Sequence, residues 1–143
     1  MDTKKSIIFI VNPISGTHEK DEIPRLIEEH LDKTLFSPEV IFTEYAGHAA
    51  ELARQYASQG TDVVVAVGGD GTINEVARSL VHTKTALGII PCGSGNGLAR
   101  HLCIPLDPVR AIKLINCCQI EDFDYGVIND LISWNKRKRR RKK

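Results

Sequence analysis

The sequence lacks the long apolar stretches of proteins that cross a membrane or are exported through one. No run of apolar residues approaches the roughly 20 that a helix needs to span a bilayer. The first apolar segment, residues 6–11, follows too closely on Lys4 and Lys5 to leave an apolar signal-peptide core with a cleavage site. We therefore expect a cytoplasmic protein, with any membrane contact being peripheral.

Paired cysteines are also lacking. The four cysteines form no Cys-x-x-Cys pair, and of the five histidines only His82 and His101 lie near them in the sequence. This spacing argues against a zinc site and favours reduced, packed thiols. The cysteines are Cys92, Cys103, Cys117 and Cys118.

Positive charge is scarce outside the C-terminus. A basic run begins at Lys136 and ends at Lys143, and its eight residues are nearly half of the 19 Lys and Arg residues. The rest of the chain holds 11 basic and 18 acidic residues, a formal charge of −7. A body this acidic does not attract nucleic acid by bulk electrostatics, so no nucleic-acid partner is expected.

Two common nucleotide-binding fingerprints are missing. The chain has no Gly-x-x-x-x-Gly-Lys-Ser/Thr phosphate loop and no Gly-x-Gly-x-x-Gly that opens a helix. The nearest match, residues 93–98, has its third glycine one position early. If the chain binds a nucleotide, it does so through a different motif.

Residues 63–75 read as a buried strand, a glycine turn and a helix start. The run 63–67 is short and rich in valine, which favours a central strand of a parallel sheet. Thr72 and Glu75 have the spacing of a capping box, which predicts that a helix begins where the glycines end. The amide hydrogens at a helix start suit a phosphate, which can approach them closely where glycines lack a Cβ. Asp70 would repel a bare phosphate and is easier to explain if it helps to hold a metal ion, although an isolated Gly-Asp-Gly is also an ordinary turn.

Strands and helices alternate four times along the chain, at a spacing of about 25 residues. This order predicts an α/β fold, a doubly wound and mostly parallel sheet with helices on both faces. Every strand-to-helix loop of such a sheet opens at the same edge, so these loops should meet in one crevice. The predicted strands are 6–11, 39–43, 63–67 and 86–90; the predicted helices are 21–34, 47–58 and three that begin near residues 72, 98 and 107; the loops are 12–16, 43–47, 68–72 and 91–97.

Four ordered blocks carry a family resemblance. They are Asn12-Pro13-x-Ser15-Gly16, Thr43 ahead of Gly47-His48-Ala49, Gly68-Gly69-Asp70-Gly71-Thr72-Ile73-Asn74-Glu75, and Gly88-Ile89-Ile90-Pro91 with Gly93-Ser94-Gly95-Asn96. In order and spacing they resemble the nucleotide-binding domain of the diacylglycerol kinase and sphingosine kinase family of lipid kinases, over about residues 5–130. The Gly-Asp-Gly loop alone is shared with NAD kinases and phosphofructokinases, so it indicates the superfamily rather than the substrate.

The resemblance implies magnesium-assisted transfer of the γ-phosphate of ATP to the hydroxyl of a lipid alcohol at the membrane surface. ATP and Mg²⁺ are the implied cofactors, held in a phosphofructokinase-like and NAD-kinase-like nucleotide-binding domain. Asp70 is the implied catalytic and metal-binding residue. The implied nucleotide-binding residues are Asn12, Pro13, Ser15, Gly16, Thr43, Gly68, Gly69, Asp70, Gly71, Thr72, Asn74, Glu75, Gly93, Ser94, Gly95 and Asn96.

The resemblance also sets expectations for the domains. Residues 1–121 would be the nucleotide-binding domain, residues 122–130 the start of a truncated β-rich second domain, and residues 131–143 a disordered basic tail. In the family, the second domain supplies the lipid pocket and the general base. Many members have Asn-Asp where this chain has Asn96 and Gly97, which leaves the lipid open. The apolar surface that a second domain would cover makes a homo-oligomer plausible.

Two other functions remain open at this point. One is an NAD-kinase-like phosphotransferase. The other is a catalytically inactive nucleotide-binding fragment that attaches to anionic membranes through residues 136–143, since each cation near such a surface adds about 1 kcal/mol. A tail without an evolved role is the competing explanation for that basic run.

Overall fold

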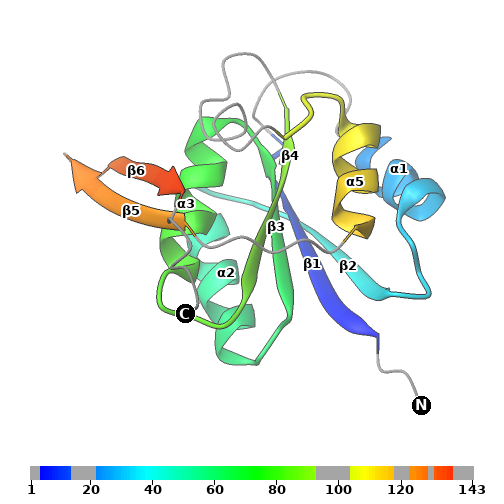
Figure 1. Cartoon of the computed structure of the whole chain (residues 1–143), viewed down its shortest axis with the longest axis horizontal. Helices are drawn as coiled ribbons and strands as arrows, with labels where there is room; N and C mark the ends of the chain where they lie inside the picture. Colours follow the sequence, from blue (N-terminus) through cyan, green and yellow to red (C-terminus); the bar gives the residue numbers. More distant parts are fainter. Residues whose placement is uncertain (1–3, 14–21, 93–103, 118–122, 129–130, 137–143) are drawn as a thin grey trace, which may run out of the picture.

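The computed structural model describes residues 4–13, 22–92, 104–117, 123–128 and 131–136. Its centre is a four-stranded, all-parallel sheet with the order β2-β1-β3-β4 (Figure 1). The strands are β1 (Lys5–Val11), β2 (Phe36–Phe42), β3 (Val63–Gly68) and β4 (Ala86–Pro91). The predicted parallel α/β sheet is therefore confirmed.

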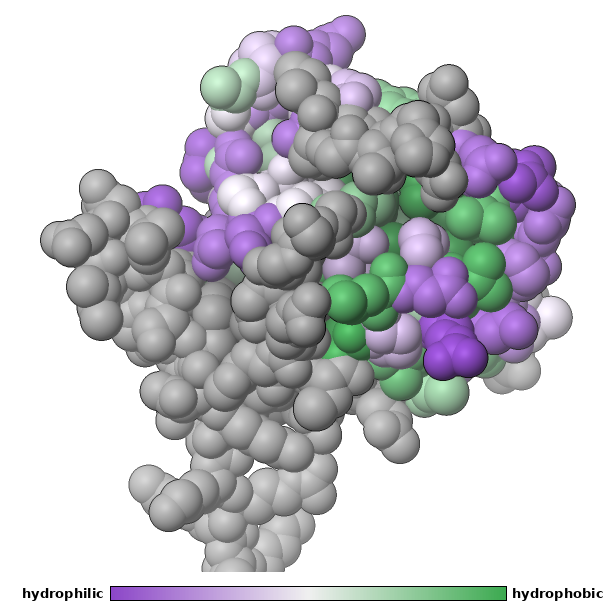
Figure 2. Space-filling view, turned by 90° about the horizontal axis from the view of Figure 1, so that it is seen from above, coloured by the Kyte–Doolittle hydropathy of each residue, from purple (hydrophilic) through white to green (hydrophobic). Residues whose placement is uncertain are grey.

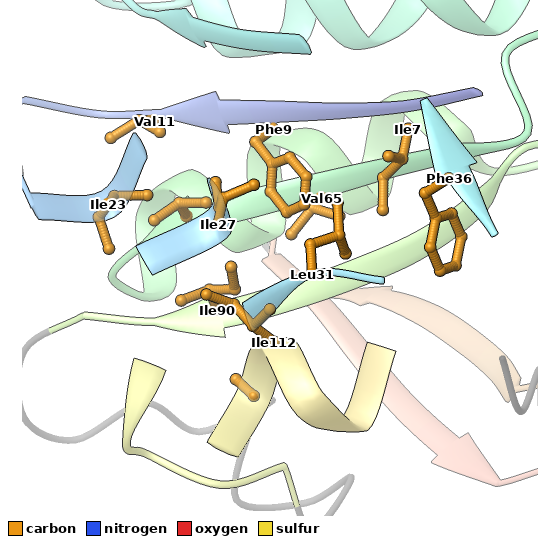
Figure 3. Close-up of a cluster of buried hydrophobic side chains, with 12 residues drawn as sticks. Ile7, Phe9, Val11, Ile23, Ile27, Leu31, Phe36, Val65, Ile90 and Ile112 are labelled. Atoms are coloured by element: carbon orange, nitrogen blue, oxygen red, sulfur yellow. The ribbon is translucent and has the colours of Figure 1, made fainter. Parts of the chain in front are cut away.

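Helices cover both faces of this sheet, as predicted (Figure 1). α2 (His48–Ser58) and α3 (Asp70–Leu80) pack on one face, and α1 (Ile23–His30) and α5 (Pro108–Asn116) pack on the other. Because side chains alternate along a strand, β1 feeds both layers. Ile8 and Ile10 join the α2 and α3 layer, and Phe9 joins the α1 and α5 layer. Figure 3 shows the second layer closing around Phe9.

The two central strands are the most deeply buried elements. The side chains of Phe9, Ile10, Val65 and Ala66 are 0% exposed. At Gly88, β4 lies so close to β3 that an added Cβ would stand 2.8 Å from Val65 Cγ2. A side chain at Gly88 would therefore collide with Val65.

The start of α3 differs from the prediction. Thr72 and Glu75 were expected to form a capping box, but the helix begins at Asp70, and its N-cap residue, Gly69, makes no side-chain cap. The backbone of Gly69 is extended, and Ile73 N donates to Gly69 O at 3.0 Å, so the first helical turn already includes Thr72. Both capping-box side chains instead bond to other elements, as described below.

The N-cap of α5 was predicted correctly. Asp107 accepts a hydrogen bond from Val109 N at 3.2 Å, and Pro108 occupies the first turn. This is the arrangement that an aspartate followed by a proline favours at a helix start. The helix predicted near residue 98 begins outside the described residues.

A second, two-stranded antiparallel sheet is formed by β5 (Phe123–Ile128) and β6 (Leu131–Lys136). It lies beside α3 and apart from the parallel sheet (Figure 1). The prediction of a disordered tail from residue 131 is therefore wrong for β6, because Leu131 pairs with Ile128 and Lys136 pairs with Phe123. Residues 137–143 lie outside the described part. No helix of the described residues is long and apolar enough to cross a membrane.

Candidate functional site

The described parts of the four predicted loops lie along one edge of the sheet. Three main-chain hydrogen bonds join neighbouring strand ends: Asn12 N to Val67 O at 3.2 Å, Thr43 N to Val11 O at 2.8 Å, and Cys92 N to Gly68 O at 2.9 Å. Seen from the side where the strands end, the described surface combines hydrophilic, near-neutral and hydrophobic areas (Figure 2). The predicted convergence of loops is therefore present in the described residues.

The glycine loop leads directly from β3 into α3. Gly69 has no side chain with which to cap the first turn, so the amide hydrogens there are not used by a local cap. A Cβ on Gly71 would meet no atom within 4 Å. A helix start without a side-chain cap, at the positive end of a helix dipole and with open space beside Gly71, suits an anion.

Asn12 ties the end of β1 to this helix start. Its Nδ2 donates to Oγ1 of Thr72 at 3.0 Å, across 60 residues of sequence. Thr72 is buried, being 5% exposed. The threonine predicted as a cap is thus the acceptor of a tertiary hydrogen bond, which the spacing of the motif alone does not reveal.

Glu75 points away from its own helix start and toward α2. Its Oε1 accepts from Ala50 N at 3.4 Å, and it lies 3.9 Å from where a Cβ on Gly47 would stand. Gly47 is the N-cap residue of α2, with a φ of 89°, and makes no side-chain cap. The carboxylate of one helix therefore occupies the capping position of its neighbour.

Asn74 lies in the first turns of α3, and only the nitrogen of its side-chain amide has a hydrogen-bond partner among the described residues. Its Nδ2 donates to Asp70 O at 3.0 Å, which tightens the helix start. Its Oδ1 is buried and has no hydrogen-bond partner among the described residues. A buried amide oxygen without a hydrogen-bond partner marks a position at which a further hydrogen-bond donor could bind.

The loop before α2 is held by several side-chain contacts. The amide of Glu44 donates to Nδ1 of His48 at 3.0 Å, and the His48 ring stacks on Tyr45 with centroids 4.4 Å apart. The Tyr45 hydroxyl donates to the Glu51 carboxylate, and this bond raises the pKa of Tyr45. Thr43, at the end of the strand before this loop, is buried. The stack of Tyr45 and His48 could not be predicted from the sequence, which shows only that the two rings are present.

Several predicted site residues cannot be placed. Pro13 is exposed beside Asn12 at the sheet edge, but Ser15, Gly16, Gly93, Ser94, Gly95 and Asn96 lie outside the described residues. The described site is therefore built from the ends of β1, β2 and β3 and the starts of α2 and α3. Its members among the predicted residues are Asn12, Pro13, Thr43, Gly68, Gly69, Asp70, Gly71, Thr72, Asn74 and Glu75.

The residues present offer a magnesium ion little protein coordination. Within the described ranges, no group of three or more His, Cys, Asp or Glu side chains could hold a metal ion. Asp70 is exposed in the first turn of α3, and the Glu75 carboxylate faces α2. Magnesium in phosphoryl-transfer sites usually keeps waters and takes one or two carboxylates together with substrate phosphates. The described residues therefore fit an ion that arrives with a phosphate substrate, to which Asp70 could offer its exposed carboxylate.

A separate hollow of about 590 Å³ lies at the opposite edge of the sheet, between the connections that enter β3 and β4. Several of its hydroxyls already donate to main-chain carbonyls, as Thr85 does to Thr61 O at 2.7 Å and Thr83 does to Leu80 O at 2.6 Å. Ligands of parallel α/β sheets bind at the carboxyl ends of the strands. The chemistry of the chain therefore lies with the glycine loop rather than in this hollow.

Most of the chain is similar to known proteins. The family model of the diacylglycerol kinase catalytic domain matches residues 6–128. Diacylglycerol kinases of Staphylococcus saprophyticus and Staphylococcus aureus are 35% and 33% identical over 129 and 130 residues, which is 88% and 89% of this chain. The chain spans about two fifths of the length of these relatives, 42% and 41%.

Solved structures give the same result for the fold. A diacylglycerol kinase from Bacillus anthracis superposes with a TM-score of 0.77 at 27% identity, covering 92% of this chain and 46% of that protein. A putative diacylglycerol kinase from the same organism gives a TM-score of 0.79 at 27% identity, covering 90% and 47%. The sheet, the glycine loop and the family model agree: the chain belongs to the diacylglycerol kinase catalytic domain family.

Proposed function

We propose that this chain is the nucleotide-binding part of an ATP-dependent lipid kinase, which transfers the γ-phosphate of ATP to the hydroxyl of a lipid alcohol. The observation that carries the proposal is the glycine-rich start of α3 at the carboxyl edge of a parallel sheet, where no side chain caps the helix and the space that a Cβ on Gly71 would take is open. Backbone amides at a helix start are what the β- and γ-phosphates of a nucleotide require. The family match supports a lipid rather than a dinucleotide as acceptor.

In this proposal the described residues have distinct roles. The backbone from Gly68 to Gly71 binds the phosphates, and the Asn12 to Thr72 hydrogen bond holds the loop after β1 against them. Asp70 is the nearest carboxylate to the bound phosphates and orients the ion that accompanies ATP. When bound, that Mg²⁺ would neutralise charge on the transferred phosphoryl group.

The acceptor is proposed as diacylglycerol or a related lipid alcohol, following the names of the relatives. Because the chain spans under half of those relatives, the groups that bind the lipid and deprotonate its hydroxyl are proposed to lie in sequence that this chain does not include. We expect the described site to bind ATP by itself and to support transfer only together with such sequence.

The direct test is calorimetric titration of the 143-residue chain with ATP in saturating magnesium. We expect saturable binding for which inorganic triphosphate and GTP compete well and NAD competes weakly, because the described contacts address a triphosphate. A chain that stays folded but binds neither ATP nor triphosphate would overturn the proposal. A second assay supplies diacylglycerol, sphingosine and NAD as acceptors to a longer relative, and phosphorylation of NAD alone would overturn the lipid assignment.

A further inference from the structure

The N-terminus of α2 has no capping side chain of its own. Its N-cap residue is Gly47, which has a left-handed backbone and no side chain that could accept from the amide of Ala50. A Ser, Thr, Asp or Asn usually fills that role. The acceptor that the structure supplies is instead the Glu75 carboxylate of α3, 3.4 Å from Ala50 N.

Gly47 also lies next to this carboxylate. A Cβ on Gly47 would stand 3.9 Å from Glu75 Oε1, which is ordinary van der Waals contact. Around this contact, α2 and α3 pack together through the cluster that contains Ala49, Ala53 and Val76. Small residues on α2 bring the two helices close, and a negative charge at a helix N-terminus is favourable to the helix dipole.

The segment that this contact anchors is the loop from Thr43 to His48. One end is fixed to the sheet by Thr43 N, which donates to Val11 O at 2.8 Å. The other end is the start of α2, where His48 N donates to Tyr45 O and Glu51 N donates to Gly47 O. Loss of the carboxylate would remove the contact between α3 and the helix end of this loop, while the contacts within the loop and at its sheet end stay in place.

We propose that Glu75 is a positioning residue: it caps α2 from α3 and thereby holds the loop from Thr43 to His48 against the phosphate-binding start of α3. This inference rests on the proposed function only for its effect on nucleotide affinity. It assigns Glu75 to the neighbouring helix, whereas the family resemblance implies a direct contact with ATP. The same glutamate therefore links the two helix starts that face the site.

The experiment compares Glu75→Ala with wild type by amide hydrogen exchange and by ATP titration of the full 143-residue chain. We expect exchange at the first-turn amides of α2, Ala50 above all, to accelerate about fivefold, the effect of losing one helix cap. ATP affinity should fall by a similar factor. Glu29→Ala, on α1 and away from the site, is the matched control and should change neither.

The decisive variant restores a carboxylate on α2 itself. Ala50→Asp places a negative charge in the first turn of α2, and Ala50 is only half-buried, so the side chain has room. In the Glu75→Ala background we expect Ala50→Asp to restore both the slow exchange and the ATP affinity. Glu75→Gln, which keeps an acceptor oxygen without the charge, should fall between wild type and Glu75→Ala.

The outcomes separate the inference from the proposed function. Unchanged exchange at Ala50 in Glu75→Ala overturns the cap. If Ala50→Asp restores slow exchange but ATP affinity stays low, the positioning role is overturned, and Glu75 is assigned a direct contact with the nucleotide. If wild type does not bind ATP, the proposed function fails, and the exchange data still decide whether Glu75 caps α2.

Discussion

Gly88 is the residue at which two strands of the sheet approach too closely to admit a side chain. A Cβ there would stand 2.8 Å from Val65 Cγ2, and Val65 is itself fully buried. The valine cannot turn away, because it is surrounded by the α1 and α5 layer. The absence of a side chain at Gly88 therefore makes room for the side chain of its paired residue, Val65.

We predict that Gly88→Ala lowers the free energy of unfolding by about 1–3 kcal/mol, the usual effect of overpacking a core. Urea denaturation measures the change. Gly71→Ala is the matched control, since a Cβ there meets no atom within 4 Å and alanine favours a helix. Equal stability of the Gly88→Ala variant and wild type would contradict the close approach of the two strands.

Asp70 is the only acidic residue in the first turn of α3. We predict that Asp70→Asn weakens ATP binding in the presence of magnesium but strengthens it when magnesium is removed by chelation. Each change should be about fivefold, because one charge about 4 Å away contributes about 1 kcal/mol in water. Calorimetric titration with and without EDTA measures both effects. The same shift in both conditions would remove Asp70 from ion binding, and Glu29→Gln is the charge-matched control.

At the residue scale, the sequence predicted which residues lie at this edge of the sheet. It did not predict which groups their side chains contact. Asn12, Thr43 and Asp70 lie at the same sheet edge, as the motif blocks implied. The capping box was wrong because the extended backbone at Gly69 starts the helix two residues early. The bond from Asn12 to Thr72 spans 60 residues, and local spacing carries no information about it.

At the scale of elements, α5 is the one described helix whose N-cap residue accepts a hydrogen bond through its side chain. We predict that Asp107→Ala lowers the free energy of unfolding by about 1 kcal/mol, because the amide of Val109 loses its acceptor. Asp107→Asn keeps an acceptor oxygen and should remain close to wild type. If both variants lose the same stability, the loss comes from the exposed ion pair with Arg110 rather than from the cap.

The contact between α2 and β2 makes stability depend on pH. Tyr56 donates to Glu39 Oε2 at 2.9 Å, and burial together with this bond raises the pKa of Tyr56 above its usual 10.0. The unfolded chain then releases the phenolic proton at a lower pH than the folded chain does. Stability from this group is therefore complete below pH 10 and is lost as pH rises through the higher folded value.

We predict that Tyr56→Phe flattens the decline of stability above pH 10 relative to wild type. Thermal unfolding measured across this range tests it. Tyr45, whose pKa is also raised, stays in both proteins, so the difference between them belongs to Tyr56. Parallel pH profiles for the two proteins would contradict a role for the Glu39 contact.

β2 shows why the boundary of an element is harder to predict than its existence. The sequence placed this strand at residues 39–43, with Pro38 as its entrance, but the structure begins it at Phe36. Pro38 pairs opposite Ile7 without disrupting the sheet because β2 is an edge strand, with β1 as its one neighbour. A proline, which lacks an amide hydrogen, is tolerated at such an edge.

At the scale of the whole molecule, charge is divided between an acidic body and a basic C-terminal run. We predict that removal of residues 136–143 reduces binding to phosphatidylserine vesicles, because each Lys or Arg near an anionic surface contributes about 1 kcal/mol. Co-sedimentation with and without these residues measures the change, and neutral phosphatidylcholine vesicles are the control. Equal binding of the two chains would exclude these residues as a membrane tether.

The architecture as a whole was predictable because its signals are repeated. Four apolar runs followed by helical patterns predicted a parallel sheet, and the two layers around β1 and β3 follow from alternation along those strands. The β5 and β6 pair was not predicted, because the basic residues after Trp134 resemble a disordered tail. Antiparallel pairing depends on a partner strand, which composition does not show.

The place of β1 in the sheet has a consequence for synthesis of the protein. β1 leaves the ribosome before both of its partners, because β2 and β3 begin only at Phe36 and Val63. Until then the nascent chain carries an unpaired strand rich in isoleucine, with both edges open to pairing with another chain. A chaperone that captures short apolar strands would find its target here, in the interval before Val67 emerges to pair with Val11.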